Sequence, residues 1–396
     1  MSRRQRLCIL GSTGSVGCST LDVVALHPER FEVHVLTAQR RVDALRDQCL
    51  QHRPQWAVVE RAEDARTLQD ALRDAGLRTE VLHGHQALSQ VASSPDTDIV
   101  MAAIVGAAGL EPCLAAARAG KRLLLANKEA LVLGGAFFMQ AVRDGGAELL
   151  PIDSEHSAIF QCLPEDRGQW AARIDHIVLT ASGGPFRTRP ADTLDQVTPD
   201  EACAHPNWVM GRKISVDSAS MMNKALEMIE ARWLFDLAPS DIRVVLHPQS
   251  IVHSMVVCRD SSVMAQLGTP DMRVPIAVGL AWPHRIASGA ATLDFTALAD
   301  LTFEAADLRR FPALRLAREA LDGPSGLAAV LNGANEVAVA AFLDHRLRFT
   351  DIHRVNEAAM DALAGHLAPQ TSLEGILDAD LRARAWAEQK VRELSA

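Results

Sequence analysis

The sequence predicts an α/β protein with three parts: an N-terminal parallel sheet covered by helices, a central α+β region and a C-terminal helical bundle. Apolar runs alternate strictly with helix-type patterns over residues 1–150. The middle then shows strand patterns without a helix between each, and from about residue 311 the pattern is almost entirely helical. With 396 residues, the chain is also too long for one ordinary core, so several domains are expected.

Residues 1–150 predict a domain of alternating strands and helices. Short apolar runs typical of strands occupy 7–10, 31–36, 56–59, 98–104, 122–126 and 147–152. Segments with helical spacing and Gly or Pro stops follow these runs, at 20–28, 42–52, 65–76, 110–120 and 135–146. Strict alternation of this kind implies a mostly parallel sheet with helices on both faces.

Residues 151–285 predict a second domain of a different kind. Its strand patterns, at 174–186, 244–258 and 262–270, indicate antiparallel pairing in an α+β arrangement. Residues 286–310 are expected to form a linker. The C-terminal helical domain, 311–396, has helix patterns at 311–322, 326–345, 350–366 and 381–394.

Composition excludes several classes of protein. A net charge of -9, no tyrosine and 4% aromatic residues argue against a protein that binds nucleic acid. No apolar run approaches the ~20 residues of a membrane helix, and the apolar stretch after the basic N-terminus is too short for a signal peptide. Seven cysteines with no C-x-x-C spacing are typical of reduced thiols. We therefore expect a cytoplasmic protein that does not associate with a membrane.

A glycine trio lies between the first strand and the first helix. Gly11, Gly14 and Gly17 form a variant of the dinucleotide fingerprint, in which glycines allow the backbone to approach a pyrophosphate at the helix N-terminus. The alternative is a plain strand–turn–helix. The position in the first strand–helix unit of an alternating pattern favours a Rossmann-like nucleotide-binding domain.

The end of the second strand indicates which nicotinamide cofactor binds. Sites for NAD usually end this strand with an acidic residue, whereas here Thr37 takes that position and Arg40 and Arg41 follow. Two guanidinium groups can bind a ribose phosphate, although a solvated arginine pair is the simpler interpretation. Together with the missing acid, the pair favours NADP.

Three carboxylates suggest a divalent cation. Asp153 and Glu155 follow an apolar strand pattern, and alternate residues of an extended segment point the same way. The pair could instead be a solvated loop that opens a helix. With Glu227 as a third carboxylate, the set would make an all-oxygen site suited to Mg²⁺ or Mn²⁺.

A predicted helix over 218–233 carries polar residues among methionines. Asn223, Lys224 and Glu227 share one face of it, and the simplest interpretation of Lys224 and Glu227 is a surface ion pair. A phosphate site explains more of the polar residues, since hydroxyls, an amide and an ammonium suit a phosphate group. Ser182, Ser218, Asn223 and Lys224 supply these groups. Isolated histidines such as His156 and His205 are more often structural than ligands.

These motifs together resemble the 1-deoxy-D-xylulose 5-phosphate reductoisomerase family, and the resemblance covers essentially the whole chain. It depends on nine segments in one order: GSTGSVG, MAAIVGAAGL, LLANKE, PIDSEHSAIFQ, SGGPF, HPNWVMGRKISVDSASMMNKALEMIEARWLF, HPQSIVHSMV, GTPDMR and NGANEVAVAAF. The resemblance implies an NADPH-binding first domain, a central catalytic domain, a C-terminal helical domain and a homodimer.

The resemblance also implies roles for individual residues. The implied metal ligands are Asp153, Glu155 and Glu227, and the implied catalytic residues are Lys128, Glu155 and Glu227. The implied substrate contacts are Lys128, Ser154, Glu155, Ser182, His205, Trp208, Ser218, Asn223, Lys224 and Glu227, with a mobile lid near 205–213. The implied NADPH contacts are Thr13, Gly14, Ser15, Val16, Gln39, Arg40, Arg41, Asn127, Glu129 and Gly211. Many relatives have a Gly-Lys-Asn-like turn where this chain has residues 39–41, which keep the charge but not the glycine.

The implied reaction converts 1-deoxy-D-xylulose 5-phosphate, a sugar phosphate, to 2-C-methyl-D-erythritol 4-phosphate in the non-mevalonate isoprenoid pathway. A divalent ion would act as Lewis acid while the carbon skeleton rearranges, and NADPH would then deliver hydride. Lys128, Glu155 and metal-bound water are all possible proton carriers. Two alternatives are another metal-dependent NADP dehydrogenase or isomerase of a sugar phosphate, and a non-catalytic NADP-sensing regulator.

Overall fold

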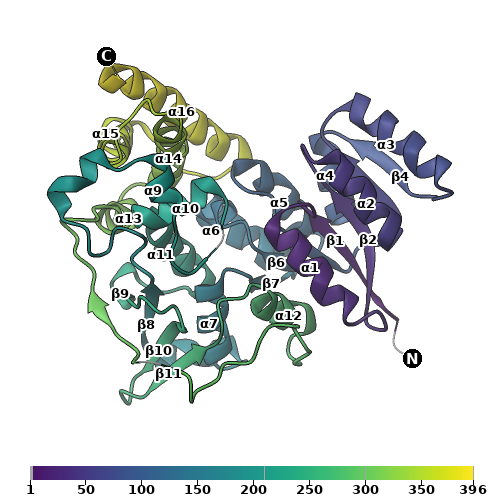
Figure 1. Cartoon of the computed structure of the whole chain (residues 1–396), viewed down its shortest axis with the longest axis horizontal. Coiled ribbons are helices and arrows are strands. Elements are labelled where there is room, and N and C mark those ends of the chain that lie inside the picture. The colour runs from purple at the N-terminus through teal and green to yellow at the C-terminus, as the bar shows by residue number, and fades with distance from the viewer. Residues whose placement is uncertain (1–2, 209, 299, 396) are drawn as a thin grey trace. The chain divides into compact units, whose positions relative to one another are not determined.

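A computed structural model describes residues 3–208, 210–298 and 300–395 of the chain (Figure 1). The chain divides into two compact units. The first contains the residues up to Ala130 together with Phe138–Ser157 and Asp271–Ala291, and the second contains Leu131–Phe137, Ala158–Pro270 and the residues from Thr292 on. These two units do not test the predicted domain boundaries at residues 150, 285 and 310, which stay a prediction.

The first unit contains a seven-stranded, all-parallel sheet in the order β4-β3-β2-β1-β5-β6-β7. The strands are β1 (Gln5–Leu10), β2 (Phe31–Thr37), β3 (Trp56–Val59), β4 (Glu80–His83), β5 (Ile99–Ala102), β6 (Arg122–Leu125) and β7 (Glu148–Pro151). The interior strand β5 is buried along its whole length, whereas the edge strand β4 has no buried residue. This pattern agrees with a sheet covered on both faces.

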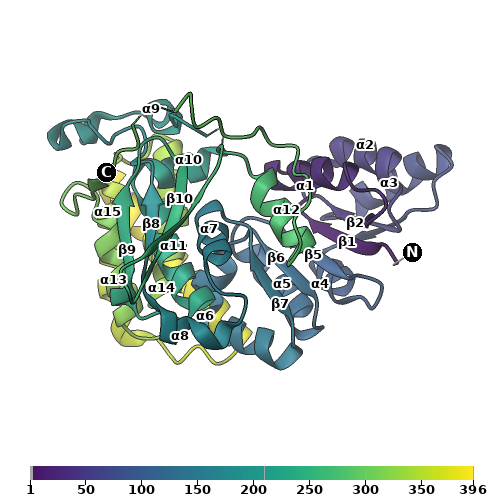
Figure 2. The same ribbon diagram turned by 90° about the horizontal axis from the view of Figure 1, so that it is seen from below.

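Helices cover both faces of this sheet. The helices of the first unit are α1 (Ser15–Ala25), α2 (Val42–His52), α3 (Ala62–Asp74), α4 (His85–Ser93), α5 (Leu110–Arg118) and α12 (Arg273–Ala281). Helices α1 and α12 pack together on one face, and α4 and α5 pack together on the other (Figure 2). Helix α12 is far from the other helices in sequence, yet it contributes to the core of the first unit.

The second unit contains a five-stranded mixed sheet in the order β11-β10-β8-β9-β12. Its strands are β8 (Ile174–Ala181), β9 (Ile242–Leu246), β10 (Val252–Cys258), β11 (Val263–Leu267) and β12 (Glu304–Ala305). The pairs β10–β11 and β10–β8 are antiparallel, and β8–β9 is parallel. The chain between β8 and β9 forms α9 (Pro199–Cys203), α10 (Arg212–Ala219) and α11 (Met222–Phe235), and α11 packs on both strands.

The C-terminal part of the second unit is helical. It contains α13 (Ala313–Asp322), α14 (Leu327–Leu343), α15 (Asp351–Leu363) and α16 (Leu373–Ser395). Helix α14 is the central one and packs against α13, α15 and α16, which Figure 1 shows beside it. Its buried positions lie on every side of the helix, as expected for a helix enclosed by others. Within the described residues, no helix is long and apolar enough to cross a membrane.

The structure confirms the predicted α/β class and corrects several details. The pairing in the second sheet is not wholly antiparallel, because the helices between β8 and β9 return the chain in the same direction. The predicted helix over 218–233 is interrupted at Met221, whose φ of 62° separates α10 from α11. Strand β4 and helix α4 were not predicted, since the four-residue strand Glu80–His83 has no buried apolar run.

Candidate active site

The glycine loop after β1 has the close approach that its sequence predicts. Gly11 has a φ of 84°, and a Cβ there would lie 2.8 Å from the carbonyl oxygen of Ala103. A Cβ on Gly17 would collide with the Gly11 carbonyl oxygen. The Gly11 amide donates to Thr37 Oγ1 at 2.8 Å, which ties the loop to the end of β2. Only glycine fits at these positions.

Helix α1 begins directly after this loop. Gly14 is its N-cap and contributes no side-chain hydrogen bond, so the amides of the first turn are not capped by a side chain. Ser15 and Val16 form that first turn, and Thr13 lies just before it. This arrangement can bind an anion at the helix N-terminus, as the fingerprint predicts.

The residues after β2 present positive charge. Gln39, Arg40 and Arg41 are exposed, and Arg41 is the N-cap of α2 with an ordinary φ of −91°. No glycine-like backbone is needed here, so the Gln-Arg-Arg sequence fits the turn without strain. Arg40 and Arg41 are both exposed just after β2, so their guanidinium groups are accessible to a phosphate.

The segment after β6 is more buried than a surface loop. The Asn127 side chain donates to the carbonyl oxygens of Gly106 (2.9 Å) and Ile104, and its Oδ1 accepts the Ala130 amide at 2.7 Å. Asn127 therefore fixes the turn that follows β5. Glu129 begins α6 (Glu129–Gly145) and is 5% exposed.

Asp153 and its neighbours follow β7 at the start of α7 (Ser154–Cys162). Lys128 Nζ lies 2.8 Å from Asp153 Oδ2, and Ser154 Oγ donates to Glu155 Oε2 at 2.5 Å. The carbonyl oxygen of Asp153 accepts the Ser157 amide at 2.8 Å, so Glu155 lies in the first helical turn. The expectation of an extended segment at Asp153–Glu155 is wrong, and the helix-opening alternative is right. The helical turn still keeps both carboxylates at the end of β7.

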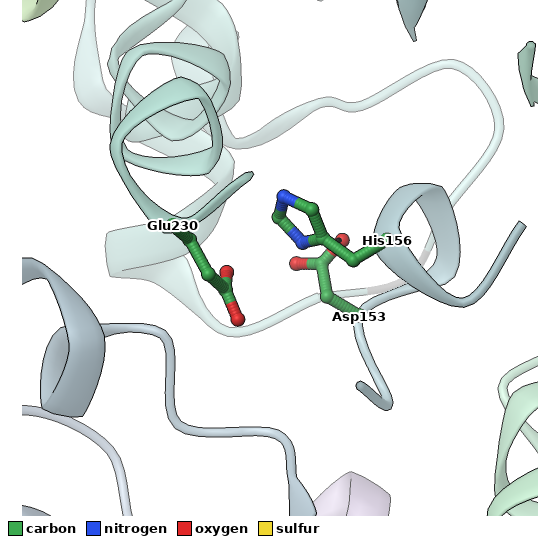
Figure 3. A group of neighbouring side chains, drawn as sticks. All are labelled: Asp153, His156 and Glu230. Carbon is green, nitrogen blue, oxygen red and sulfur yellow. Dashed lines mark ion pairs between the residues drawn. The ribbon is translucent and has the colours of Figure 1, made fainter. Parts of the chain in front are cut away.

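His156 is completely buried beside this turn. Its Nδ1 lies 3.6 Å from Asp153 Oδ1, and Figure 3 shows the ring next to the carboxylate. This contact favours a role in which the imidazole orients Asp153. Sequence reasoning treated His156 as structural, and its neighbour suggests that it supports a candidate ligand.

Helix α11 of the second unit carries the other acidic residues. Asn223 and Lys224 both donate to the Glu227 carboxylate. Glu227 and Lys224 are 1% and 3% exposed, so the pair is buried and the surface-pair interpretation is wrong. Glu230, also drawn in Figure 3, lies one turn further along and is 0% exposed. Sequence reasoning missed Glu230, which the i, i+3 spacing from Glu227 could have indicated.

The serine and histidine residues of the second unit come together after β8. Ser182 Oγ lies 2.9 Å from His205 Nε2 and accepts the Gly184 amide at 3.1 Å. The Nδ1 of His205 accepts the Asn207 and Trp208 amides, so its Nε2 carries the proton and donates to Ser182. Burial lowers the pKa of His205, which keeps the imidazole neutral at pH 7.

Ser218 joins this group through the backbone. A Cβ on Gly184 would lie 2.9 Å from the Ser218 carbonyl oxygen, so the loop after β8 packs directly on the end of α10. Gly184 has a φ of 64° and was not among the predicted site residues, although the SGGPF motif contains it. The hydroxyls of Ser182 and Ser218 are thus held on neighbouring segments.

His253 on β10 was also missed. Its pKa is lowered to about 4, first by burial and then by the positive charges of neighbours that include Lys224. An uncharged imidazole therefore lies near Lys224. Trp208 is partly buried before α10 and Gly211 is the exposed N-cap of α10. The predicted lid near 205–213 includes position 209, which lies outside the described residues.

The predicted cofactor contacts belong to the first unit, except for Gly211 at the start of α10 in the second. The acidic pair Asp153 and Glu155 also belongs to the first unit. Glu227 and the predicted phosphate contacts belong to the second unit. The carboxylates and their lysine partners suit a hard cation, and the hydroxyl, amide and ammonium groups suit a phosphate.

Comparison with known proteins gives one family along the chain. Residues 7–135 match the model of 1-deoxy-D-xylulose 5-phosphate reductoisomerase, residues 149–235 match the model of its C-terminal domain, and residues 267–386 match that of the DXP reductoisomerase C-terminal domain.

Similar proteins cover nearly the full length. The 1-deoxy-D-xylulose 5-phosphate reductoisomerase of Pseudomonas fluorescens is 59% identical over 392 residues, 98% of each chain. That of Cupriavidus necator is 59% identical over 391 residues, 99% of each chain.

Solved structures agree. A DOX-P reductoisomerase crystallised with NADPH, fosmidomycin and magnesium is 45% identical with a TM-score of 0.95, over 98% of this chain and 99% of that one. The Zymomonas mobilis reductoisomerase in complex with NADPH is 44% identical with a TM-score of 0.92, over 99% of each chain. The chain belongs to the 1-deoxy-D-xylulose 5-phosphate reductoisomerase family.

Proposed function

We propose that this chain converts 1-deoxy-D-xylulose 5-phosphate to 2-C-methyl-D-erythritol 4-phosphate, with NADPH and Mg²⁺ or Mn²⁺, as a step of isoprenoid biosynthesis. The observation that carries the proposal is the full-length match to a reductoisomerase crystallised with NADPH, fosmidomycin and magnesium. The glycine loop, the acidic residues and the phosphate-type residues of this chain are the parts that such an enzyme requires.

Asp153, Glu155 and Glu227 are the metal ligands in this proposal. All three side chains offer oxygen donors alone, which suits Mg²⁺ or Mn²⁺ better than a set with an imidazole. A bound divalent ion supplies Lewis-acid chemistry at the substrate's oxygens.

Lysines next to the carboxylates support this assignment. Lys128 faces Asp153 and Lys224 faces Glu227, so each of these acids already has a compensating cation. Lys128 would turn from Asp153 toward a substrate oxygen, and the Ser154 hydroxyl would donate a hydrogen bond to the substrate. Lys128 and Glu155 would be the side chains of this chain that move a proton.

The substrate phosphate is assigned to the second unit. Ser182, Ser218, Asn223 and Lys224 would bind it, and His205 would orient Ser182 through its Nε2 proton. Trp208 would cover the substrate from the lid segment. Binding energy from the phosphate, remote from the reacting carbons, would then favour lid closure and the exclusion of water.

NADPH is assigned to the first unit and to the start of α10. Thr13, Gly14, Ser15 and Val16 would receive the pyrophosphate, and Arg40 and Arg41 the ribose phosphate. The remaining assigned contacts are Gln39, Asn127, Glu129 and Gly211. Asn127 would act mainly by holding the turn after β5, since its side chain already bonds three backbone groups.

We also propose that the protein is located in the cytoplasm and forms a homodimer. All seven cysteines are free in the structure, as expected for a reducing compartment. Large apolar side chains are exposed between residues 292 and 310, among them Phe295 and Phe303, and such a surface suits a second copy of the chain.

The test is metal-dependent NADPH oxidation with 1-deoxy-D-xylulose 5-phosphate as substrate. The wild type should give a branched product; an unrearranged alcohol would indicate a simple dehydrogenase instead. Asp153→Asn should lower turnover by at least about 100-fold while NADPH binding, followed by cofactor fluorescence, is kept. Asp74→Asn, at the exposed end of α3, is the control and should be fully active. Full activity of Asp153→Asn at ordinary metal concentrations would refute the ligand assignment.

A further inference from the structure

A buried carboxylate connects helix α10 to the C-terminal helices of the second unit. Asp217, near the end of α10, is 1% exposed. Its Oδ1 accepts a hydrogen bond from Asn335 Nδ2 of α14 at 2.8 Å, and its Oδ2 lies 2.9 Å from Lys213 Nζ. Asp217 therefore contacts its own helix and α14 at the same time.

The network continues on both sides of Asp217. Asn335 Oδ1 accepts from Asn356 Nδ2 of α15 at 3.1 Å, and both asparagines are fully buried. Lys213 Nζ also lies 2.7 Å from Glu336 Oε1 of α14. Side-chain contacts thus join three helices, α10, α14 and α15, and Figure 1 labels these helices.

The presence of a buried carboxylate at Asp217 is not explained by stability alone. Burial of a charged group is unfavourable unless ions and hydrogen bonds compensate for it, and apolar residues of similar size often give equal or greater stability. Directional bonds from two helices instead fix the rotation and the position of α10, which apolar packing does less well.

The position of α10 matters for the proposed phosphate site. Ser218 directly follows Asp217, and the Ser218 carbonyl oxygen lies against Gly184 in the loop that carries Ser182. Lys213 is the second residue of α10 and the last residue of the segment assigned as the lid. A shift of α10 would therefore move the Ser218 hydroxyl and the end of the lid together.

We propose that Asp217 and Asn335 are positioning residues for the substrate phosphate: their hydrogen bond holds Ser218 and the C-terminal end of the lid in place for binding. This inference rests on the proposed reductoisomerase function and adds two residues to it that touch neither the substrate nor the metal. It also gives the C-terminal helices an indirect role in substrate binding.

The test compares two buried asparagines of the same helix. Asn335→Ala removes the hydrogen bond to Asp217, and Asn332→Ala is the control, since Asn332 is fully buried on α14 and its side chain has no hydrogen-bond partner among the described residues. Asn335→Ala should raise the KM for 1-deoxy-D-xylulose 5-phosphate by about tenfold and leave the KM for NADPH unchanged. Asn332→Ala should leave both constants unchanged, whatever its effect on the melting temperature.

A purely structural role would give a different pattern. Asn335→Ala would then lower the melting temperature with the substrate KM unchanged, and the inference would be refuted. If Asn335→Ala does not fold, Asn335→Ser, which is closer in size and polarity to the native residue, replaces it under the same criteria. A wild type without turnover would refute the proposed function itself, whereas an active wild type with an unaffected Asn335 variant refutes only this inference.

Discussion

Individual side chains show how negative charge is compensated in the candidate site and its support. Asp153 has Lys128 at 2.8 Å, Glu227 has Lys224, and Asp217 has Lys213 at 2.9 Å. Each acid is thus compensated by a lysine three, four or 25 residues away in sequence. A flexible ammonium can leave its carboxylate when a divalent cation arrives, which an arginine fork would do less readily. This choice of lysine suits carboxylates that exchange one cation for another.

The cofactor preference can be tested at Arg40. If its guanidinium binds the ribose phosphate, Arg40→Ala should raise the KM for NADPH by about tenfold or more and leave the KM for NADH almost unchanged, because NADH lacks that phosphate. Steady-state kinetics with both cofactors give the comparison. Arg66→Ala, an exposed arginine of α3, is the control and should alter neither constant. Equal losses for NADPH and NADH in Arg40→Ala would contradict the assignment.

The helices and strands differ in how well the sequence predicts them. Strands β1, β2, β3, β5, β6 and β7 were predicted because their central residues are buried on both faces and form apolar runs. The edge strand β4 and the short α4 lack such runs. The break at Met221 could not be predicted, since methionine has no preference for a positive φ and tertiary packing imposes it. Packing likewise places α12 in the first unit, although its residues are distant in sequence.

The sequence indicates candidate ligands and substrate contacts more readily than the residues that support them. Residues proposed to have a direct chemical role, such as Glu227 and Ser182, stand out because polar groups interrupt apolar patterns. Gly184 and Asn335 do not stand out, because their function depends on which segment lies across from them. Such contacts join residues far apart in sequence, and spacing along the chain cannot indicate them.

Helix α15 gives a prediction about pH and stability. Burial lowers the pKa of His353 from 6.5 to about 4, and neither ring nitrogen has a hydrogen-bond partner among the described residues. Between pH 6.5 and 4 the unfolded chain binds the extra proton and the folded one does not. The free energy of unfolding should therefore fall with decreasing pH by up to about 1.4 kcal/mol per unit from this residue.

His353→Leu should remove this part of the pH dependence. Urea unfolding of wild type and variant at pH 7, 6 and 5 measures it, and the variant should gain stability relative to the wild type as the pH falls. His366→Gln, an exposed histidine after α15, serves as control and should keep the wild-type slope. Parallel slopes for wild type and His353→Leu would show that His353 is not responsible.

At the scale of the whole molecule, the exposed apolar side chains predict the assembly. Phe295, Leu301, Phe303 and Leu308 all lie in the described part of 292–310 and are at least 37% exposed, and Phe295 is 69% exposed. Burying such side chains against a second chain is favourable by about 25 cal/mol per Å². We therefore expect light scattering to give about twice the 42.8 kDa of one chain at micromolar concentration.

The same experiment locates the interface on this segment. Phe295→Ser should weaken the dimer by at least about tenfold, seen as a monomer fraction that grows on dilution, because an exposed aromatic residue is a frequent binding hot spot. Leu381→Ser is the matched control, since Leu381 on α16 is also apolar and 64% exposed but lies outside the segment. A monomeric wild type would refute the homodimer, and equal weakening by both substitutions would refute its location. A dimer that depends on Phe295 would give the segment between α12 and α13 a function of its own.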